Sequence, residues 1–255
     1  MRRLPTVLVL GGTTEATALI EALAPRIGRD LDVVVSFAGR TTRPTAPAGT
    51  VRIGGFGGVD GLAEYLSSTP VDVAVDALHP FAAVMPCNAA EACRAVGVDL
   101  LRLQRPSWST TDGDDWAPVA DMSEASAEVA LRSPQRVLLT IGRQELDPFR
   151  PIVGPTFLVR SIEPPDLDGA WAAVSILDRG PFHLEGERDL LARESVDLLV
   201  TKNSGGTATA AKLTAARELG VPVVMVERPP KPPVPTVSSV DEAIAWIDER
   251  VHTAG

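Results

Sequence analysis

The stretch VLVLGGTTEATALIEAL, residues 7–23, decides the fold of the N-terminal part of the chain. Its apolar residues 7–10 predict a buried strand, and Gly11 and Gly12 predict a tight turn into a helix near residues 15–24. A helix that starts behind such glycines presents unpaired N–H groups to an anion. The dinucleotide fingerprint G-x-G-x-x-G, laid from Gly11, finds Thr13 at its second glycine and Ala16 at its third. Alanine is tolerated there, but the threonine is a departure, so the turn alone leaves the ligand open.

Strands and helices alternate along the rest of the chain, because apolar runs bounded by turn residues are separated by stretches with helical spacing. This alternation predicts an α/β protein of two Rossmann-like domains with mainly parallel sheets. The domains are expected at 1–106 and 116–255, joined by a polar linker at 107–115. The expected strands are 7–10, 33–36, 51–53, 73–76, 100–103, 117–120, 137–141, 157–160, 196–200 and 221–226, and the expected helices are 15–24, 58–68, 82–96, 124–132, 184–194, 209–219 and 240–251. The proline-rich run 228–235 predicts an extended surface connector.

Composition excludes several classes of protein. A net charge of −9 argues against a nucleic-acid surface, and no apolar run approaches the ~20 residues of a membrane helix. The N-terminus carries no export signal, so a cytoplasmic location is expected. Cys87 and Cys93 lie six residues apart on one expected helix, which supports neither a disulfide framework nor a metal site. Any anionic ligand must therefore meet locally placed cations or helix N-termini.

The end of the second expected strand indicates which cofactor the turn would take. NAD-binding folds place Asp or Glu there for the ribose hydroxyls, but residues 36–43 read SFAGRTTR and contain no acid. Ser36, Arg40 and Arg43 offer a hydroxyl and two guanidinium groups, which suit a 2′-phosphate. The sequence therefore predicts NADPH rather than NADH, unless these arginines only solubilise a loop. Gly54 and Gly55 would clear space for a flat ligand near the adenine side.

Catalytic motifs are sparse. The chain has no HExxH, GxSxG, GxxxxGK[ST] or Tyr-x-x-x-Lys pattern, so the difficult chemical step is expected from a cofactor. The second half repeats the glycine device at Gly205 and Gly206, with Lys202 just before them. Two alternatives stay open at this point. One is a sugar-nucleotide transferase of two facing α/β domains, with Glu227 on the ribose, and the other is a non-catalytic NADP(H) sensor.

Six motifs in one order together resemble the precorrin-6A reductase family of the aerobic cobalamin pathway. They are GGTTE at 11–15, HPFA at 79–82, LRLQRP at 101–106, LTIGRQEL at 139–146, RGPF at 179–182 and TKNSGGT at 201–207. They extend over nearly the whole chain. The family typically reads Thr-His-Pro where this chain has Leu78, His79 and Pro80, so any hydrogen bond made by that threonine side chain is lost here.

The resemblance implies that NADPH reduces one double bond of the precorrin-6A macrocycle to give precorrin-6B, without metal or flavin. The substrate, a tetrapyrrole with many carboxylates, would lie in the cleft between the domains, and transient contact with neighbouring pathway enzymes is expected. Lys202 and His79 are the expected catalytic residues, with bulk water as an alternative proton source. The expected cofactor-binding residues are Gly11, Gly12, Thr13, Thr14, Glu15, Ser36, Gly39, Arg40, Arg43, Gly54, Gly55, His79, Pro80 and Phe81. The expected substrate-binding residues are Arg102, Arg105, Arg143, Gln144, Glu145, Lys202, Asn203, Ser204, Gly205 and Gly206.

Overall fold

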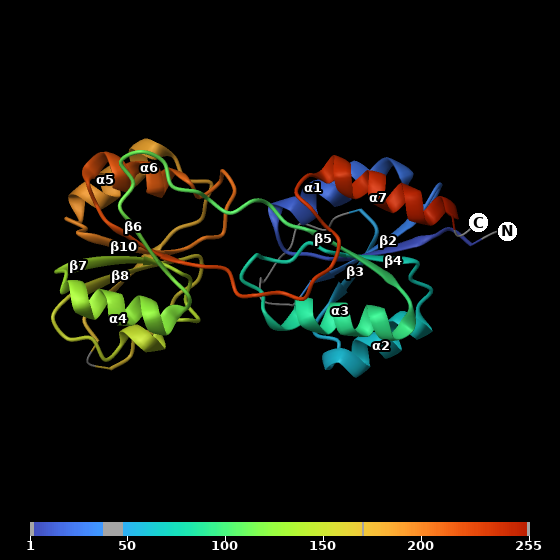
Figure 1. The fold of residues 1–255 in the computed structure, drawn as a ribbon, viewed down its shortest axis with the longest axis horizontal. Helices are drawn as coiled ribbons and strands as arrows, with labels where there is room; N and C mark the ends of the chain where they lie inside the picture. The colour runs from blue at the N-terminus through green and yellow to red at the C-terminus, as the bar shows by residue number, and fades with distance from the viewer. Residues whose placement is uncertain (1–2, 38–47, 170, 254–255) are drawn as a thin grey trace. The chain divides into compact units, whose positions relative to one another are not determined.

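The chain divides into two compact units (Figure 1). The computed structural model describes residues 3–37, 48–169 and 171–253. The first unit combines Met1–Pro106 with Pro230–Gly255, and the second unit is Ser107–Pro229. Both are α/β, as predicted, and each has a six-stranded sheet in which all strand pairs are parallel.

The sheet of the first unit has the order β12-β5-β4-β1-β2-β3. Read from β3, this is the 3-2-1-4-5-6 order of dinucleotide-binding folds, with β12 in the sixth place. Its strands are β1 (Thr6–Leu10), β2 (Asp32–Phe37), β3 (Thr50–Ile53), β4 (Val73–Asp76), β5 (Asp99–Leu103) and β12 (Thr236–Val237), and its helices are α1 (Thr14–Leu23), the short η1 (Ala24–Arg26), α2 (Gly58–Ser68), α3 (Val84–Val96) and α7 (Val240–Thr253).

Helices cover both faces of this first sheet (Figure 1). Val7 and Val9 pack with α1 and α7 on one face, whereas Leu8 and Leu10 pack with α2 and α3 on the other. Successive side chains of a strand point to opposite faces, so a strand covered on both sides must be apolar throughout. This is why the run 7–10 shows no alternation of apolar and polar residues.

The C-terminal segment belongs to the first unit, which corrects the expected second domain of 116–255. Strand β12 pairs with β5, and Ala243 and Ile247 of α7 are fully buried in the core that α1 also lines. The expected linker 107–115 also proves to be part of the second unit, where the Trp108 N–H donates to Asn203 Oδ1 at 2.8 Å. Local patterns predict that a helix or strand exists, but they carry no information about which sheet it joins.

The second unit has the strand order β6-β11-β10-β7-β8-β9. Helices α5 and α6 cover one face of the sheet, and α4 covers the other (Figure 1). The strands are β6 (Trp116–Val119), β7 (Arg136–Thr140), β8 (Thr156–Ser161), β9 (Ala173–Leu177), β10 (Leu198–Lys202) and β11 (Val223–Val226), and the helices are α4 (Met122–Arg132), the short η2 (Asp147–Phe149), α5 (Leu184–Arg193) and α6 (Ala211–Leu219). The sequence did not predict the partly exposed edge strand β9 or the two-residue β12.

Each sheet has one point where the chain reverses its direction of winding. In the first unit, β2 and β3 extend outward from β1, whereas β5 and β12 extend the opposite way from β4. In the second unit the same reversal separates β7 from β10. Open parallel sheets bind ligands just beyond the carboxyl ends of the two strands at this switch point. We therefore expect ligands at the loops after β1 and β4, and at those after β7 and β10.

Candidate functional site

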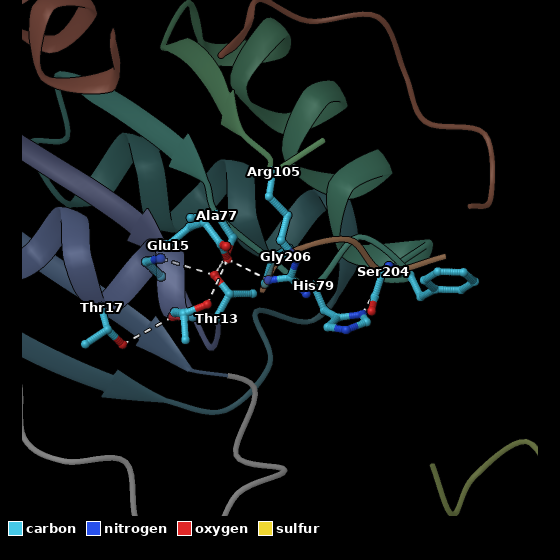
Figure 2. Close-up of polar contacts among 12 residues, drawn as sticks. Thr13, Glu15, Thr17, Ala77, His79, Arg105, Ser204 and Gly206 are labelled. Atoms are coloured by element: carbon cyan, nitrogen blue, oxygen red, sulfur yellow. Dashed lines mark hydrogen bonds and ion pairs between the residues drawn. The ribbon is translucent and has the colours of Figure 1, made fainter. Parts of the chain in front are cut away.

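Thr13 joins the two loops at the switch point of the first unit (Figure 2). Its hydroxyl accepts from the N–H of Ala16 at 3.1 Å, which caps α1, and donates to the carbonyl of Ala77 beyond β4 at 2.8 Å. A glycine at this position would make neither bond. The departure from the dinucleotide fingerprint thus has a structural reason, because the threonine ties the start of α1 to the end of β4.

The glycines of this turn leave room for a ligand. Gly12 has φ +125°, which L side chains rarely adopt, and a Cβ added to it would meet no atom within 4 Å. Gly11 is different, because its Cβ would make ordinary contacts with Ala16, Val35 and Phe37 at 3.5–3.6 Å. Gly12 is therefore the residue whose backbone requires glycine. The open space beside it and the start of α1 lie where the sequence predicted an anion site.

Glu15 and Arg105 form an ion pair at the start of α1 (Figure 2). Arg105 Nη1 lies 2.7 Å from Glu15 Oε2, and the two side chains are 16% and 21% exposed. Glu15 was expected to contact the cofactor and Arg105 the substrate, and the structure brings them together. The guanidinium neutralises a carboxylate that would otherwise repel an anion at the helix N-terminus.

Strands β2 and β3 place Arg52 beside Ser36, an arrangement that the sequence did not predict. Ser36 and Arg52 are register partners, and Arg52 Nη1 lies 3.4 Å from Ser36 Oγ. Arg52 also donates to the carbonyls of Gly54 and Gly55 at 2.6 and 2.7 Å, and it stacks 3.6 Å above the Phe56 ring. A Cβ on Gly54 or Gly55 would meet no atom within 4 Å.

Arg40 and Arg43, the other residues predicted to bind a 2′-phosphate, lie outside the described residues, and so does Gly39, which was expected to bind the cofactor. Their expected roles stay predictions. Within the described chain, Arg52 is the guanidinium that the fold brings to the end of β2, since parallel pairing sets it next to Ser36.

Arg102 is a structural residue, which corrects its expected role in substrate binding. It is only 6% exposed, donates from Nε to Asp76 Oδ2 at 3.0 Å, and donates from Nη1 to the carbonyl of Pro232 at 3.0 Å. Asp76 is 1% exposed and also accepts from the N–H of Leu78. The buried pair fixes the end of β4 and anchors the returning chain, so the Arg102 guanidinium is enclosed by protein.

His79 lies in the loop after β4 and is exposed. Its Nδ1 accepts from the N–H of Phe81 at 3.2 Å, so a neutral imidazole carries its proton on Nε2. Pro80 is buried behind it, and Leu78 packs partly buried among the residues of α2 and α3. The residue that replaces the family's usual threonine is therefore a core contact here.

Lys202 and Glu145 join the two loops at the switch point of the second unit. Lys202 is the last residue of β10, and its Nζ forms an ion pair with Glu145 Oε2 in the loop after β7. Arg143 and Gln144 in the same loop are exposed, and Arg143 pairs with Glu163 at 2.6 Å. The expected cluster of Arg143, Gln144, Glu145 and Lys202 therefore sits at one switch point.

Three carbonyl groups of the loop after β10 accept hydrogen bonds from side chains of the same unit. Arg228 donates to the carbonyls of Asn203 and Ser204 at 2.9 and 3.1 Å, and the indole Nε1 of Trp108 donates to the carbonyl of Gly206 at 2.9 Å. In a trans peptide, the N–H points opposite to the carbonyl of the same unit. The N–H groups that follow Ser204 and Gly206 are therefore turned away from Arg228 and Trp108.

Gly205 and Gly206 have φ values of +69° and +83°, which is the left-handed conformation that glycine adopts at little cost. Among the described residues, the N–H groups of Gly205, Gly206 and Thr207 have no hydrogen-bond acceptor. Asn203 is buried, and its side chain holds Trp108 at both backbone groups. Asn203 thus shapes the loop, and the glycine N–H groups lie where the sequence predicted an anion cradle.

The two cysteines differ in exposure. Cys87 is exposed, whereas Cys93 is buried, and burial raises the pKa of its thiol to about 12. In the part of the chain that the structure describes, no three His, Cys, Asp or Glu side chains gather as a metal site. No helix in that part is long and apolar enough to span a membrane.

The first sheet and its glycine turn define an α/β protein with the strand order of dinucleotide-binding folds. A family model described as precorrin-6x reductase CbiJ/CobK matches residues 6–248. The chain is 49% identical to a precorrin-6A reductase of Rhodococcus erythropolis, over 94% of this chain and 96% of that protein. A precorrin-6A reductase of Rhodobacter capsulatus is 41% identical, over 97% of both chains. A cobalt-precorrin-6A reductase of Priestia megaterium is 30% identical, over 88% of this chain and 90% of that one.

A solved structure described as CobK precorrin-6A reductase matches with a TM-score of 0.88 and 40% identity, and the match covers 97% of both chains. The chain belongs to the precorrin-6x reductase family, and it is an oxidoreductase of that type.

Proposed function

We propose that this protein reduces one double bond of precorrin-6A with NADPH to give precorrin-6B. Membership in the reductase family carries this proposal, because relatives of 41–49% identity are named precorrin-6A reductases. The family favours this reaction over sugar-nucleotide transfer. Three relatives named cobalt-precorrin-6A reductases are 28–30% identical, which favours the metal-free macrocycle.

The first unit is proposed to hold NADPH. Its 3-2-1-4-5-6 strand order and the open glycine turn at the β1/β4 switch point support a pyrophosphate at the start of α1. Ser36 and Arg52, together with Arg40 and Arg43, are proposed to bind the 2′-phosphate. The fit is chemical, since a hydroxyl and guanidinium groups replace the acid that would repel a phosphate there. When bound, the nicotinamide supplies hydride to one carbon of the reduced bond.

The second unit is proposed to hold carboxylates of the macrocycle. The N–H groups of Gly205, Gly206 and Thr207 could bind one carboxylate, and the nearby Lys202 could pair with the negative charge of that carboxylate. Arg143 and Arg105 would pair with further acetate or propionate groups after exchanging their present acidic partners, Glu163 and Glu15. The substrate position between the two domains stays a prediction.

The proton that completes the reduction has three candidate sources. The Lys202 ammonium is held by Glu145, the His79 imidazole carries a proton at Nε2, and water is the third source. Single-turnover rates for Lys202→Ala and His79→Ala, at saturating NADPH, separate these sources. An unchanged rate in one variant excludes that residue as the donor, and unchanged rates in both leave water.

The reaction itself is tested anaerobically with precorrin-6A made by the upstream enzymes. We expect NADPH oxidation that depends on both protein and substrate, a product two hydrogens heavier, and slower turnover with NADH. A protein that binds NADPH but never oxidises it would be the sensor instead, and thermal stabilisation by nucleotide sugars alone would indicate the transferase. The cytoplasmic location and contacts with neighbouring enzymes stay predictions from the sequence.

A further inference from the structure

A buried group of charges lies in the second unit and has no part in the proposed chemistry. It consists of Arg160 on β8, Glu187 on α5 and Lys212 on α6, which are 6%, 2% and 4% exposed. Arg160 Nη1 donates to Glu187 Oε1 at 2.6 Å, and the Arg160 guanidinium stacks 4.2 Å from the centroid of the Phe182 ring. Burial of charge is costly unless each charge is paired, so the third member of the group requires an explanation.

Lys212 is the surplus cation of this group. Arg160 and Glu187 neutralise each other, and among the described residues no carboxylate lies within ion-pair distance of Lys212 Nζ. Burial is the main cause, and together with the neighbouring Arg160 it lowers the pKa of Lys212 to about 7, while Glu187 opposes this shift. A methionine of similar length would fill the same space without the desolvation cost. Lys212 therefore does not serve the stability of the unit.

Trp108 connects this cation to the glycine loop. Lys212 Nζ lies 5.1 Å from the centroid of the Trp108 ring, in the range of a cation–π contact. At its edge, the same indole donates from Nε1 to the carbonyl of Gly206 at 2.9 Å. The indole is thus held by Lys212 on its face and holds the loop at its edge.

We propose that Lys212, acting through Trp108, is a positioning residue that fixes the glycine loop and adds positive charge behind it for a substrate carboxylate. The proposal rests on the assignment of this loop as a carboxylate site. Low dielectric around a buried cation extends its field, and a unit charge about 10 Å from an anion, at an effective dielectric constant of about 20, changes binding about tenfold.

The test compares Lys212→Met, Lys212→Arg and Trp108→Phe in the full-length protein, with KM for precorrin-6A, kcat, KM for NADPH and Tm as readouts. For Lys212→Met we expect KM for precorrin-6A to rise about tenfold, with kcat and the NADPH KM within about twofold, and an equal or higher Tm. Trp108→Phe keeps an aromatic ring but loses the hydrogen bond to the Gly206 carbonyl, and it should also raise KM for precorrin-6A. Lys212→Arg should restore most of the affinity.

The pH profile gives an independent readout. Wild-type KM for precorrin-6A should rise as pH increases through about 7, whereas the profile of Lys212→Arg should stay flat, because arginine keeps its charge. An unchanged KM in Lys212→Met overturns the proposal, and so does a loss of kcat and Tm with no selective effect on KM. Gly206→Ala separates the role of Lys212 from the role of the glycine loop as a carboxylate site. If it raises KM while Lys212→Met does not, only the role of Lys212 is wrong, and if neither raises KM, the loop is not the carboxylate site.

Discussion

Replacement of Thr13 by glycine would restore the dinucleotide fingerprint, yet we expect it to weaken the protein. The Thr13 hydroxyl makes two hydrogen bonds, to the Ala77 carbonyl at 2.8 Å and from the Ala16 N–H at 3.1 Å. Loss of a bond to a buried carbonyl costs about 1 kcal/mol, loss of the cap in favour of glycine a few tenths, and the freer unfolded chain about 0.7 kcal/mol. The free energy of unfolding should fall by about 2 kcal/mol, and Tm by about 5–10 °C.

The assay measures urea unfolding, NADPH affinity by fluorescence titration, and amide hydrogen exchange in peptides from β1 to β4. Thr13→Gly should lose stability and affinity together, with faster exchange localised to the loops at residues 11–14 and 77–82. Thr13→Ser retains the hydroxyl and is the matched control, expected within about 0.5 kcal/mol of wild type. Tighter NADPH binding by Thr13→Gly at undiminished stability would refute the structural role of the hydroxyl, and would show that the fingerprint glycine is the better residue here.

Three further predictions concern buried groups. Arg102→Met leaves the Asp76 carboxylate buried without its cation and should lower the free energy of unfolding, measured in urea, by about 3–5 kcal/mol. The double variant Asp76→Leu with Arg102→Met should recover most of this loss. Equal losses of stability in the single and double variants would contradict this prediction. The folded-state pKa of Lys212 is about 7, below its ordinary 10.5, so between these values the unfolded chain binds more protons and stability rises with pH. Urea midpoints should therefore show wild type gaining on Lys212→Met from about pH 7 to 9, and a constant gap would count against a buried ammonium. A thiol reagent should modify only Cys87 in the native protein and Cys93 as well after unfolding, since Cys93 is buried with a raised pKa; rapid reaction of both would place Cys93 at the surface.

The sequence predicted the parts of the fold that depend on local patterns. The apolar run 7–10 and the glycines behind it marked β1 and α1 closely, because burial on both faces leaves a continuous apolar strand. Thr236 and Val237 show the limit, since a two-residue edge strand has no pattern of its own and pairs with β5 only through tertiary contacts.

The sequence predicted which residues lie at the ends of the strands. It did not predict the contacts between residues of neighbouring strands, because these depend on the register of strand pairing. Arg102 sits at a strand end, but parallel pairing sets it directly beside Asp76, which makes it a buried ion pair rather than a ligand contact. The same kind of pairing brings Arg52 to Ser36. Lys212 left a weaker signal, as a charge on the buried face of a helix between apolar neighbours.

The return of β12 and α7 to the first sheet makes the second unit an insertion within the first. During synthesis, β1 to β5 emerge before the inserted unit, but α7, which covers part of their core, follows it. At about 5–20 residues per second, the ribosome needs roughly 7–30 s to translate residues 107–253, and the inserted unit is complete before α7. The nascent first half must therefore wait with an uncovered apolar face, and a chain that ends before α7 would have a finished second unit and an unfinished first unit.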